Sequence, residues 1–361
     1  MTRKKDVFTD LLLKWHQNDN TRAMPWKGEK DPYKIWLSEV ILQQTRVEQG
    51  WAYYEKFIKE FPTVHDLASA PEQKVFKCWE GLGYYSRCRN LIATARIIVN
   101  DYNGHFPSDY DKILALKGIG PYTAAAIASF AFDLPHAVVD GNVLRVLSRY
   151  TGDATPIDST AGKKKFSALA DKLLDKEHPG LFNQAIMDFG AVICKPQNPL
   201  CASCVQRRDC QAYRTESVSE LPVKEKTLRR KHRWFYYFMV ETPDKKVYIR
   251  QRVKGDIWAD LFELIGWESE QAAYPEDLLK GEEAARLFGT RSLTVNYISK
   301  VYRQELTHQT IQGQFFTIHL DKPLTTPHDY MLIDKEKLSE YPFPKFINAW
   351  LLDPTPAQSL F

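Results

Sequence analysis

Hydrophobic residues recur at helical spacing up to about residue 213 of the chain. The face formed by Phe8, Leu11, Leu12 and Trp15 predicts a helix over 6–17. Asp31 followed by Pro32 is typical of a helix start, because an acid can cap the first N–H groups and proline fits the first turn. Further helices are expected at 47–61, 64–70, 72–79, 86–101, 108–115, 121–132, 142–151, 160–175 and 179–194. Extended patterns are scarce, so residues 1–220 are predicted to form an all-α domain.

The pattern changes after residue 220. Residues 221–233 are polar, with six Lys or Arg against one Glu, which is typical of an interdomain linker. A basic run of this kind can equally contact phosphate. Apolar runs then predict strands at 234–241, 246–251, 293–304 and 315–320, and helices at 282–288 and 344–351. Residues 234–361 are therefore expected to form a second, α+β domain.

Composition limits the possible functions without selecting one. With 361 residues, 44% of them apolar, the chain can build two globular domains. Its formal net charge of +4 permits a polyanion as partner but does not require one. Neither a signal-peptide pattern nor an apolar run of about 18 residues is present, so we expect a cytoplasmic protein without a membrane partner.

Four cysteines form the most specific pattern, Cys194-x6-Cys201-x2-Cys204-x5-Cys210. In a reducing cytosol, thiols this close in sequence indicate a metal centre more than disulfides. The candidates are a [4Fe–4S] cluster and structural zinc. Zinc sites usually pair two short Cys-x2-4-Cys knuckles, and only one is present here, so the spacing favours iron–sulfur. The other two cysteines, Cys78 and Cys88, are expected to be ordinary core residues.

A glycine hairpin precedes the helix expected at 121–132. Gly118 and Gly120 flank Ile119, which can pack inward, and Lys117 adds a positive charge at the rim. Glycines let a backbone approach an anion closely, and a helix start offers free N–H groups and a positive dipole end. A Gly-x-Gly alone is usually only a turn. Joined directly to a helix, it indicates a grip on a DNA phosphate.

Two acidic residues have different sequence environments. Glu39 has Ile35 and Leu42 as neighbours on its helix face, so burial would raise its pKa and keep it protonated near neutrality. Asp140 precedes a predicted helix, whose N–H groups and dipole would favour its charged form. Asn142 could cap that helix and leave Asp140 free for chemistry. Two acids with pKa values pushed apart suggest acid-assisted glycosidic cleavage. The simpler alternatives are a solvated charge at Glu39 and a plain helix cap at Asp140.

These stretches together resemble the endonuclease III superfamily of helix-hairpin-helix DNA glycosylases and, more closely, the MutY family of adenine DNA glycosylases. The resemblance is strongest at 36–45, 79–87, 139–145 and 183–188, in the hairpin, and in the cysteine loop. It implies a helix-hairpin-helix glycosylase domain with a [4Fe–4S] cluster loop at 194–210, followed by a Nudix-like domain. It also implies a monomer, associated with the nucleoid, that acts on double-stranded DNA. The substrate would be adenine mispaired with 8-oxoguanine or guanine.

The resemblance assigns roles to individual residues. Glu39 matches the acid that protonates adenine at N7, and Asp140 matches the carboxylate that stabilises the oxocarbenium-like sugar. Tyr122 and Asn142 match residues that support these acids. The positions where the family lines its adenine pocket are Arg22, Trp26, Leu42 and Gln184. Gln44 and Tyr84 match side chains that enter the base stack. The hairpin residues Lys117, Gly118 and Gly120 are further candidate DNA contacts, although the family often has proline at the position of Lys117.

Tyr122 also separates this chain from some relatives. Bifunctional members of the superfamily carry a lysine there, which attacks the sugar and cuts the strand, and tyrosine cannot form a Schiff base. We therefore expect a monofunctional glycosylase that works in base excision repair. The alternatives are a bifunctional endonuclease III-like glycosylase/lyase and a non-catalytic iron–sulfur DNA-binding protein.

The second domain lacks a Gly-x5-Glu-x7-Arg-Glu-type box, so pyrophosphate hydrolysis is not expected. In the MutY family a Phe-Ser-His loop in this domain recognises 8-oxoguanine. The matching residues here are Leu306, Thr307 and His308, which keep the hydroxyl and the imidazole but not the aromatic ring. Thr307 and His308 are therefore candidate DNA-binding residues, although such a pair is more often an ordinary turn.

Overall fold

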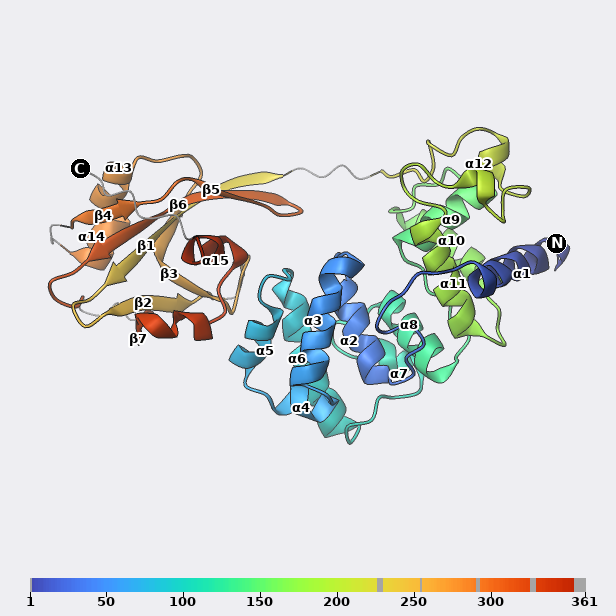
Figure 1. Ribbon diagram of the computed structural model, residues 1–361, viewed down its shortest axis with the longest axis horizontal. Coiled ribbons are helices and arrows are strands. Elements are labelled where there is room, and N and C mark those ends of the chain that lie inside the picture. Colours follow the sequence, from blue (N-terminus) through green and yellow to red (C-terminus); the bar gives the residue numbers. More distant parts are fainter. Residues whose placement is uncertain (1, 226–229, 254, 290–292, 325–328, 354–361) are drawn as a thin grey trace. The chain divides into compact units, whose positions relative to one another are not determined.

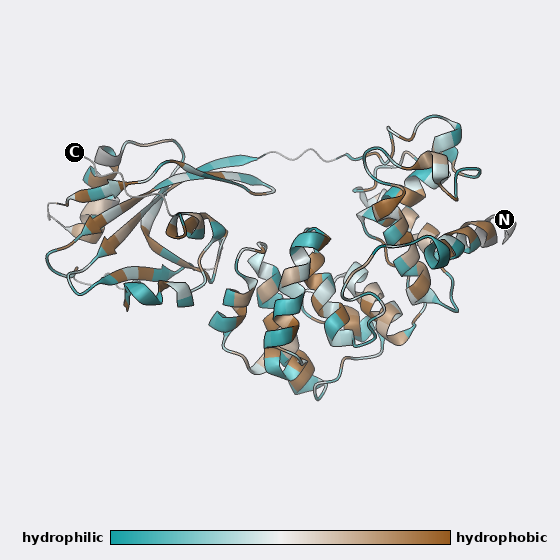
Figure 2. Cartoon of the chain, in the orientation of Figure 1, coloured by the Kyte–Doolittle hydropathy of each residue, from teal (hydrophilic) through white to brown (hydrophobic). Residues whose placement is uncertain are grey.

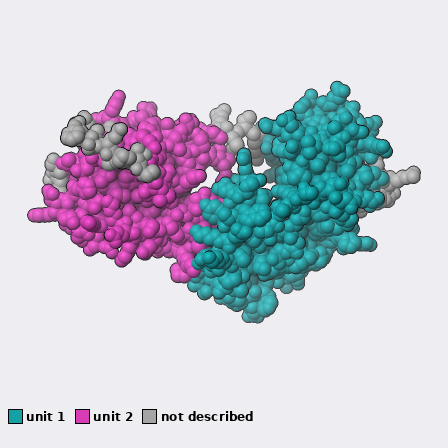
Figure 3. All heavy atoms as spheres, in the orientation of Figure 1, with its two compact units in different colours: residues 1–70, 86–227 teal, residues 71–85, 228–361 magenta. Residues whose placement is uncertain are grey.

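The computed structural model describes residues 2–225, 230–253, 255–289, 293–324 and 329–353 (Figure 1). Its residues cluster into two compact units, coloured separately in Figure 3. The first unit holds Met1–Ala70 and Ser86–Thr227, and the second holds Pro71–Tyr85 and Leu228–Phe361.

The first unit is helical, as predicted, and its described residues contain no strand. Its helices are α1 (Thr2–Asn18), α2 (Pro32–Leu42), α3 (Val47–Glu60), α4 (Val64–Ser69), α6 (Tyr85–Asp101), α7 (Tyr110–Leu114), α8 (Pro121–Phe132), α9 (Gly141–Thr151), α10 (Thr160–Leu173), α11 (Pro179–Val192), α12 (Gln211–Arg214) and the short 3-10 helix η1 (Cys201–Ser203). Figure 2 shows apolar and polar residues alternating along outer helices such as α3. In the described part of the chain, no helix combines the length and hydropathy needed to cross a bilayer.

One core fixes the helices that carry the later site. The predicted face of α1 is confirmed at Phe8, Leu12 and Trp15, which are buried among side chains of α9, α10 and α11, whereas Leu11 is only partly buried. Trp15 meets the ring of Phe189 edge-on at a centroid distance of 5.0 Å. Helices α9 and α11 therefore share a rigid support.

Helix α2 is buried on most of its surface. Asp31 caps it as predicted, accepting a hydrogen bond of 2.9 Å from the Tyr33 N–H, and Pro32 occupies the first turn. Its buried residues include Trp36, Glu39 and Val40. A carboxyl group in such a helix cannot reach bulk water, so it must find partners in the protein.

The second unit is built on a mixed sheet of seven strands in the order β4-β6-β1-β3-β2-β7, with β5 paired to β6. The strands are β1 (Lys231–Glu241), β2 (Lys246–Gln251), β3 (Phe262–Ser269), β4 (Val295–Ile298), β5 (Tyr302–Glu305), β6 (Gln309–His319) and β7 (Met331–Asp334). The helical segments of this unit are α5 (Glu72–Trp79), α13 (Pro275–Lys280), α14 (Glu282–Phe288), α15 (Lys345–Leu351) and the 3-10 helix η2 (Lys335–Glu340). Strands β1 and β6 are parallel, and the other pairs are antiparallel.

Both faces of the sheet are covered, which explains its continuous apolar runs. Along β1, Tyr236 and Phe238 pack with residues of α13 and α14. On β6, Phe315 stacks on Trp350 of α15 at 4.7 Å, and it also stacks on Tyr237 of β1. The α+β architecture predicted for this region is confirmed.

Several strand predictions were wrong. Strands β3 and β7 were not predicted, and the run at 293–304 is two strands separated at Ser299–Val301. The Ser299 hydroxyl accepts a hydrogen bond from the Phe315 N–H, which interrupts regular pairing there. Strands β1 and β6 begin at Lys231 and Gln309, earlier than expected, because their main chains pair from these residues onward. Hydropathy alone does not predict where a strand begins when its first residues are polar.

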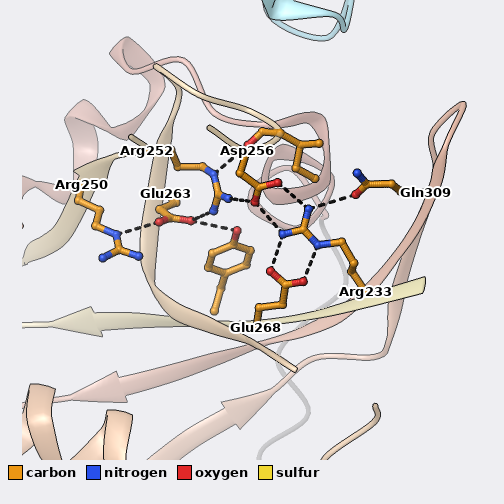
Figure 4. A network of polar contacts seen from close by, with 9 residues as sticks. Arg233, Arg250, Arg252, Asp256, Glu263, Glu268 and Gln309 are labelled. Atoms are coloured by element: carbon orange, nitrogen blue, oxygen red, sulfur yellow. Dashed lines mark hydrogen bonds and ion pairs between the residues drawn. The ribbon is translucent and has the colours of Figure 1, made fainter. Parts of the chain in front are cut away.

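A polar network explains how β3 tolerates charge (Figure 4). Its members come from β1 to β3 and the connection before β3: Arg233, Arg250, Arg252, Asp256, Glu263 and Glu268. Glu263 is buried in β3 and is paired with both Arg250 and Arg252. Arg233, assigned above to the basic linker, is instead in a strand and binds Asp256 and Glu268. This end of the basic run is therefore engaged within the second unit.

Candidate active site

A cavity of about 450 Å³ lies in the first unit. It is bounded by the segment 22–30, by α2, by the start of α8, by the start of α9 and by α11. All eight residues predicted for catalysis and substrate binding line it: Arg22, Trp26, Glu39, Leu42, Tyr122, Asp140, Asn142 and Gln184. Residues more than 160 positions apart in sequence, such as Arg22 and Gln184, are thus brought to one space.

Glu39 is the buried acid of this cavity, with 5% of its surface exposed. The Tyr122 hydroxyl donates a hydrogen bond of 2.6 Å to its Oε2. Burial raises the pKa of Glu39 to about 7, the Tyr122 hydrogen bond lowers it in part, and the nearby charge of Asp140 raises it. The expected upward shift is confirmed. Burial also raises the pKa of Tyr122 well above its ordinary value, so Tyr122 stays a proton donor.

Asp140 caps α9 itself. It accepts hydrogen bonds from the Val143 N–H at 2.8 Å and from Asn142 Nδ2 at 2.7 Å. The prediction that Asn142 would cap the helix and free Asp140 was wrong. Burial raises the pKa of Asp140, and these hydrogen bonds lower it only in part. The expectation that the helix start would dominate was therefore also wrong, because desolvation is the larger effect.

Arg145 holds Asn142 in place and was missed by the sequence reasoning. Its Nη2 donates to Asn142 Oδ1 at 2.9 Å and to the Gly190 carbonyl at 2.7 Å. The amide of Asn142 is therefore turned with its nitrogen toward Asp140. A side chain at Gly190 would collide with Asn142, because an added Cβ would lie 2.7 Å from the Asn142 Cβ. The close approach of α11 thus fixes the position of Asn142, which is hydrogen-bonded to Asp140.

Asp188 holds other side chains of the cavity in place, and it was also not predicted as a site residue. It is fully buried on α11 and accepts hydrogen bonds from Arg22 at 2.8 Å and from Gln184 at 3.0 Å. On the adjoining wall, Trp26 packs edge-on against Tyr54 at 5.3 Å. Only tertiary contacts reveal Asp188, since Arg22 is 166 residues away in sequence.

The hairpin has the geometry of a tight turn before α8. Gly118 has φ +77°, and an added Cβ would lie 2.5 Å from the Asn90 Cβ, so only glycine fits there. Ile119 is buried as predicted, and Lys117 is exposed. Gly120 precedes the first residue of α8 and provides no side-chain cap.

Gln44 and Tyr84 share an unusual backbone state. Their φ angles are +58° and +49°, a left-handed conformation uncommon for residues other than glycine, and both side chains are exposed. Such strain tends to occur at functional positions. Arg87 supports the turn that holds Gln44, donating from Nη1 to three carbonyl groups at the end of α2, including that of Gln43 at 2.7 Å.

Thr307 and His308 form an exposed turn between β5 and β6. The His308 carbonyl accepts a hydrogen bond of 2.9 Å from the Lys231 N–H, which ties the turn to the start of β1. Within the second unit, the hydroxyl groups of Tyr84 and Thr307 are hydrogen-bonded to each other. Two predicted DNA-contacting side chains are therefore neighbours in this unit.

The four clustered cysteines line one small cavity, together with Arg149 and Arg207. Arg149 Nη1 lies 3.6 Å from the Cys194 sulfur. Burial and the neighbouring thiols raise the pKa of Cys204 to about 12. Among the residues that the structure describes, no group of three or more His, Cys, Asp or Glu is arranged to hold a metal ion. The donor set of four thiols beside two guanidinium groups nevertheless fits an anionic thiolate centre. Cys78 and Cys88 are buried, as expected.

Comparison with known proteins gives two family matches. Residues 37–174 match the HhH-GPD superfamily base excision DNA repair protein family, and residues 236–352 match the NUDIX domain family. The second match covers most of the sheet of the second unit.

Several curated relatives that match more than half of this chain are adenine DNA glycosylases. The chain is 36% identical over 256 residues to the adenine DNA glycosylase of Buchnera aphidicola subsp. Baizongia pistaciae, which covers 71% of this chain and 72% of that relative. It is 42% identical over 224 residues to the adenine DNA glycosylase of Mus musculus, which covers 60% of this chain and 43% of that relative.

Among solved structures, a thermostable thymine-DNA glycosylase aligns with a TM-score of 0.55 and 32% identity, over 59% of this chain and 98% of its own. Endonuclease III in a non-covalent complex with DNA aligns with a TM-score of 0.51 and 22% identity, over 60% of this chain and 98% of its own, and shares the fold. Taken with the order of the two domains, these similarities show that the chain belongs to the MutY family of adenine DNA glycosylases.

Proposed function

We propose that the protein removes adenine mispaired with 8-oxoguanine or guanine in double-stranded DNA, by hydrolysing the N-glycosidic bond. The observation that carries the proposal is a single cavity in which buried Glu39, with a pKa of about 7, lies beside Asp140. A protonated acid and a carboxylate that line one cavity suit acid-assisted glycosidic cleavage.

In this mechanism the adenine leaves the base stack and enters the cavity, at a cost of a few kcal/mol that is smaller at a mispair. Glu39 donates its proton to the base at N7, which weakens the bond between base and sugar. Asp140 stabilises the positive charge that develops on the sugar. Water then completes the hydrolysis. Asn142 holds Asp140 by a hydrogen bond of 2.7 Å, and Tyr122 holds Glu39.

The enzyme is expected to remove the base without cutting the strand. Strand cleavage in the superfamily needs a free amine beside the sugar. Tyr122 offers none, and the two lysines that line the cavity are engaged elsewhere. Lys27 is paired with Asp188 at 3.3 Å, and Lys30 is paired with Asp133 at 3.2 Å.

DNA binding would combine several surfaces. The hairpin at Gly118 and Gly120 would hold a backbone phosphate, with Lys117 at its rim. Gln44 and Tyr84, both exposed on strained turns, would enter the base stack. The exposed turn of Thr307 and His308 would contact the base opposite the adenine.

The cysteine loop would hold a [4Fe–4S] cluster through Cys194, Cys201, Cys204 and Cys210. Such a cluster can stabilise the local fold and carry electrons, and no step of the base removal passes through it. Arg149 and Arg207 would offset its negative charge. We further propose a cytoplasmic monomer with a catalytic domain at 1–220, a linker that begins at 221 and ends before β1, and a lesion-recognition domain from β1 to 361.

The test is a set of duplexes that hold adenine opposite 8-oxoguanine, guanine or thymine, and one that holds thymine opposite guanine. Each is incubated with the protein and divided, and one half is treated with alkali, which breaks the strand at an abasic site. The proposal expects breakage at the first two, only after alkali. Breakage at the thymine–guanine pair alone would indicate a thymine glycosylase. Borohydride trapping of a protein–DNA adduct would indicate a lyase.

A further inference from the structure

A second cavity, of about 390 Å³, adjoins the candidate active site. Tyr122 lines both cavities. The second cavity also takes in Pro121, the first residue of α8 after the glycine hairpin, and Val139, the chain neighbour of Asp140. It therefore lies next to the proposed phosphate grip and next to the acid that would face the sugar. No step of the base removal uses it.

Helix α10 forms one wall of this second cavity and carries polar side chains at helical spacing. Lys163 and Ser167 are one turn apart, and Asp171 lies a further turn along. Eight helical residues span about 12 Å, so Lys163 and Asp171 stand at opposite ends of the wall. Asp171 Oδ1 accepts a hydrogen bond of 3.4 Å from the Ala137 N–H. The Lys163 end is therefore the basic end of the cavity.

His136 faces the same cavity from the segment before α9. Its ring stacks on the ring of Tyr110 at a centroid distance of 4.0 Å and an interplanar angle of 10°, which fixes its orientation. Within the described part of the chain, the side chains of Lys163, Ser167 and His136 have no hydrogen-bond or ion-pair partner. Three side chains that can donate hydrogen bonds thus line one cavity without a partner in the protein.

The lysine run near the start of α10 is unfavourable for the helix itself. Lys163, Lys164 and Lys165 lie close to its first residue, and its first turn contains no acid. The positive end of a helix dipole disfavours cations at this position. Lys165 is paired with Asp153, and Lys164 does not line the cavity. The charge of Lys163 is therefore available to an anion that enters the cavity.

We propose that Lys163, Ser167 and His136 bind a backbone phosphate of the DNA strand that carries the adenine. Once the adenine is in the active site, its sugar faces Asp140, so the adjoining backbone lies beside Val139 and the cavity that Val139 lines. An ammonium group and two further donors suit a phosphate, which offers acceptors. Such a contact positions the strand and carries no sequence information. This inference rests on the proposed function for the binding of duplex DNA.

Lys163→Met tests the charge alone, because methionine keeps an apolar stem along the cavity wall. Lys164→Met is the matched control, since it makes the same change of charge one position along the same helix and outside the cavity. The dissociation constant is measured by fluorescence anisotropy for a duplex with an abasic site opposite 8-oxoguanine, which has no base left to remove. Salt is varied between about 50 and about 200 mM.

Each phosphate contact contributes about 0.9 to the slope of the logarithm of affinity against the logarithm of salt concentration. Lys163→Met should lower this slope by about 0.9, so the rise in salt should weaken its binding about threefold less than it weakens binding by the wild type. Lys164→Met should keep the wild-type slope. Lys163→Gln serves the same purpose if the methionine variant does not fold.

A second measurement identifies the phosphate. Neutral methylphosphonate groups replace the phosphates around the abasic site one at a time. At the contacted phosphate, the replacement should weaken binding by the wild type and by Lys164→Met. It should add little in Lys163→Met, because the partner of that phosphate is already lost.

A wild-type slope in Lys163→Met, or an equal loss of slope in Lys164→Met, would overturn the proposal. A methylphosphonate scan in which no position loses its effect in Lys163→Met would also overturn it. A wild-type protein that binds the duplex through Lys163 but releases no adenine would refute the proposed function and leave this phosphate site standing.

Discussion

Tyr122→Phe gives the sharpest test of how the acid is tuned. The variant removes a single hydroxyl, which donates the 2.6 Å hydrogen bond to Glu39 Oε2. That hydrogen bond lowers the pKa of Glu39 against the effect of burial. Its loss should raise the pKa above the present value of about 7. Because a general acid works only when protonated, the alkaline limb of the pH–rate profile should then move to higher pH.

The size of the shift follows from the two protonation states. A hydrogen bond to a charged acceptor contributes roughly 1.5–3 kcal/mol, and one to a neutral carboxyl contributes about 0.5–1.5 kcal/mol. The difference is about 1–1.5 kcal/mol, and 1.36 kcal/mol corresponds to about one pKa unit. The midpoint of the alkaline limb should therefore rise by about one pH unit.

The assay is the single-turnover rate of adenine release between about pH 5 and pH 10, with each curve normalised to its own maximum. Normalisation separates the position of the limb from any loss of maximal rate. Tyr110→Phe is a matched control, since Tyr110 lies outside this cavity. An alkaline limb that stays in place or moves to lower pH in Tyr122→Phe would show that Glu39 is not the titrating acid.

Two further changes probe the rest of the chain. Cys204→Ser should abolish the visible absorbance of an iron–sulfur cluster and lower the stability of the protein. Cys78→Ala is the control and should keep the absorbance. A colourless wild-type protein that contains zinc would contradict the iron–sulfur assignment. Arg233→Gln should lower the free energy of unfolding of the second unit by about 1–2 kcal/mol, measured by urea titration at pH 7. This value allows for the partial exposure of Asp256 and Glu268, which weakens both ion pairs. Arg233 lowers the pKa of Asp256, so this difference should shrink as the pH falls below about 4. Arg230→Gln is the control and should show no such difference at pH 7, because the ion pair of Arg230 within the described residues is with exposed Glu305. Equal urea midpoints for Arg233→Gln and the wild type would refute the role of the network.

Local patterns were enough to predict the parts of the site that depend on neighbours in sequence. Glu39 could be recognised because Ile35 and Leu42 flank it on one helix face, and the structure buries it as expected. The cap at Asp31 and the inward face of Phe8, Leu12 and Trp15 follow from the same kind of pattern.

What the sequence did not predict depends on partners that are distant in the chain. Asp188 has no local mark, because Arg22 and Asn20 reach it from the other end of the first unit's sequence. Strand β3 was missed because Glu263 interrupts its apolar run. Arginines of a neighbouring strand and loop, together with the Tyr237 hydroxyl, make that buried charge tolerable. The pKa of Asp140 was misjudged because the helix start is visible in the sequence and the burial is not.

Glu39 is expected to drive base removal in this cavity. The most direct measurement is chromatographic detection of free adenine from a duplex with adenine opposite 8-oxoguanine, for the wild type and for Glu39→Gln. We expect the wild type to release adenine and leave the strand intact, and we expect Glu39→Gln to be slower by roughly 10²–10⁴-fold while it binds the same duplex. Adenine release by Glu39→Gln at the wild-type rate would contradict this role of Glu39.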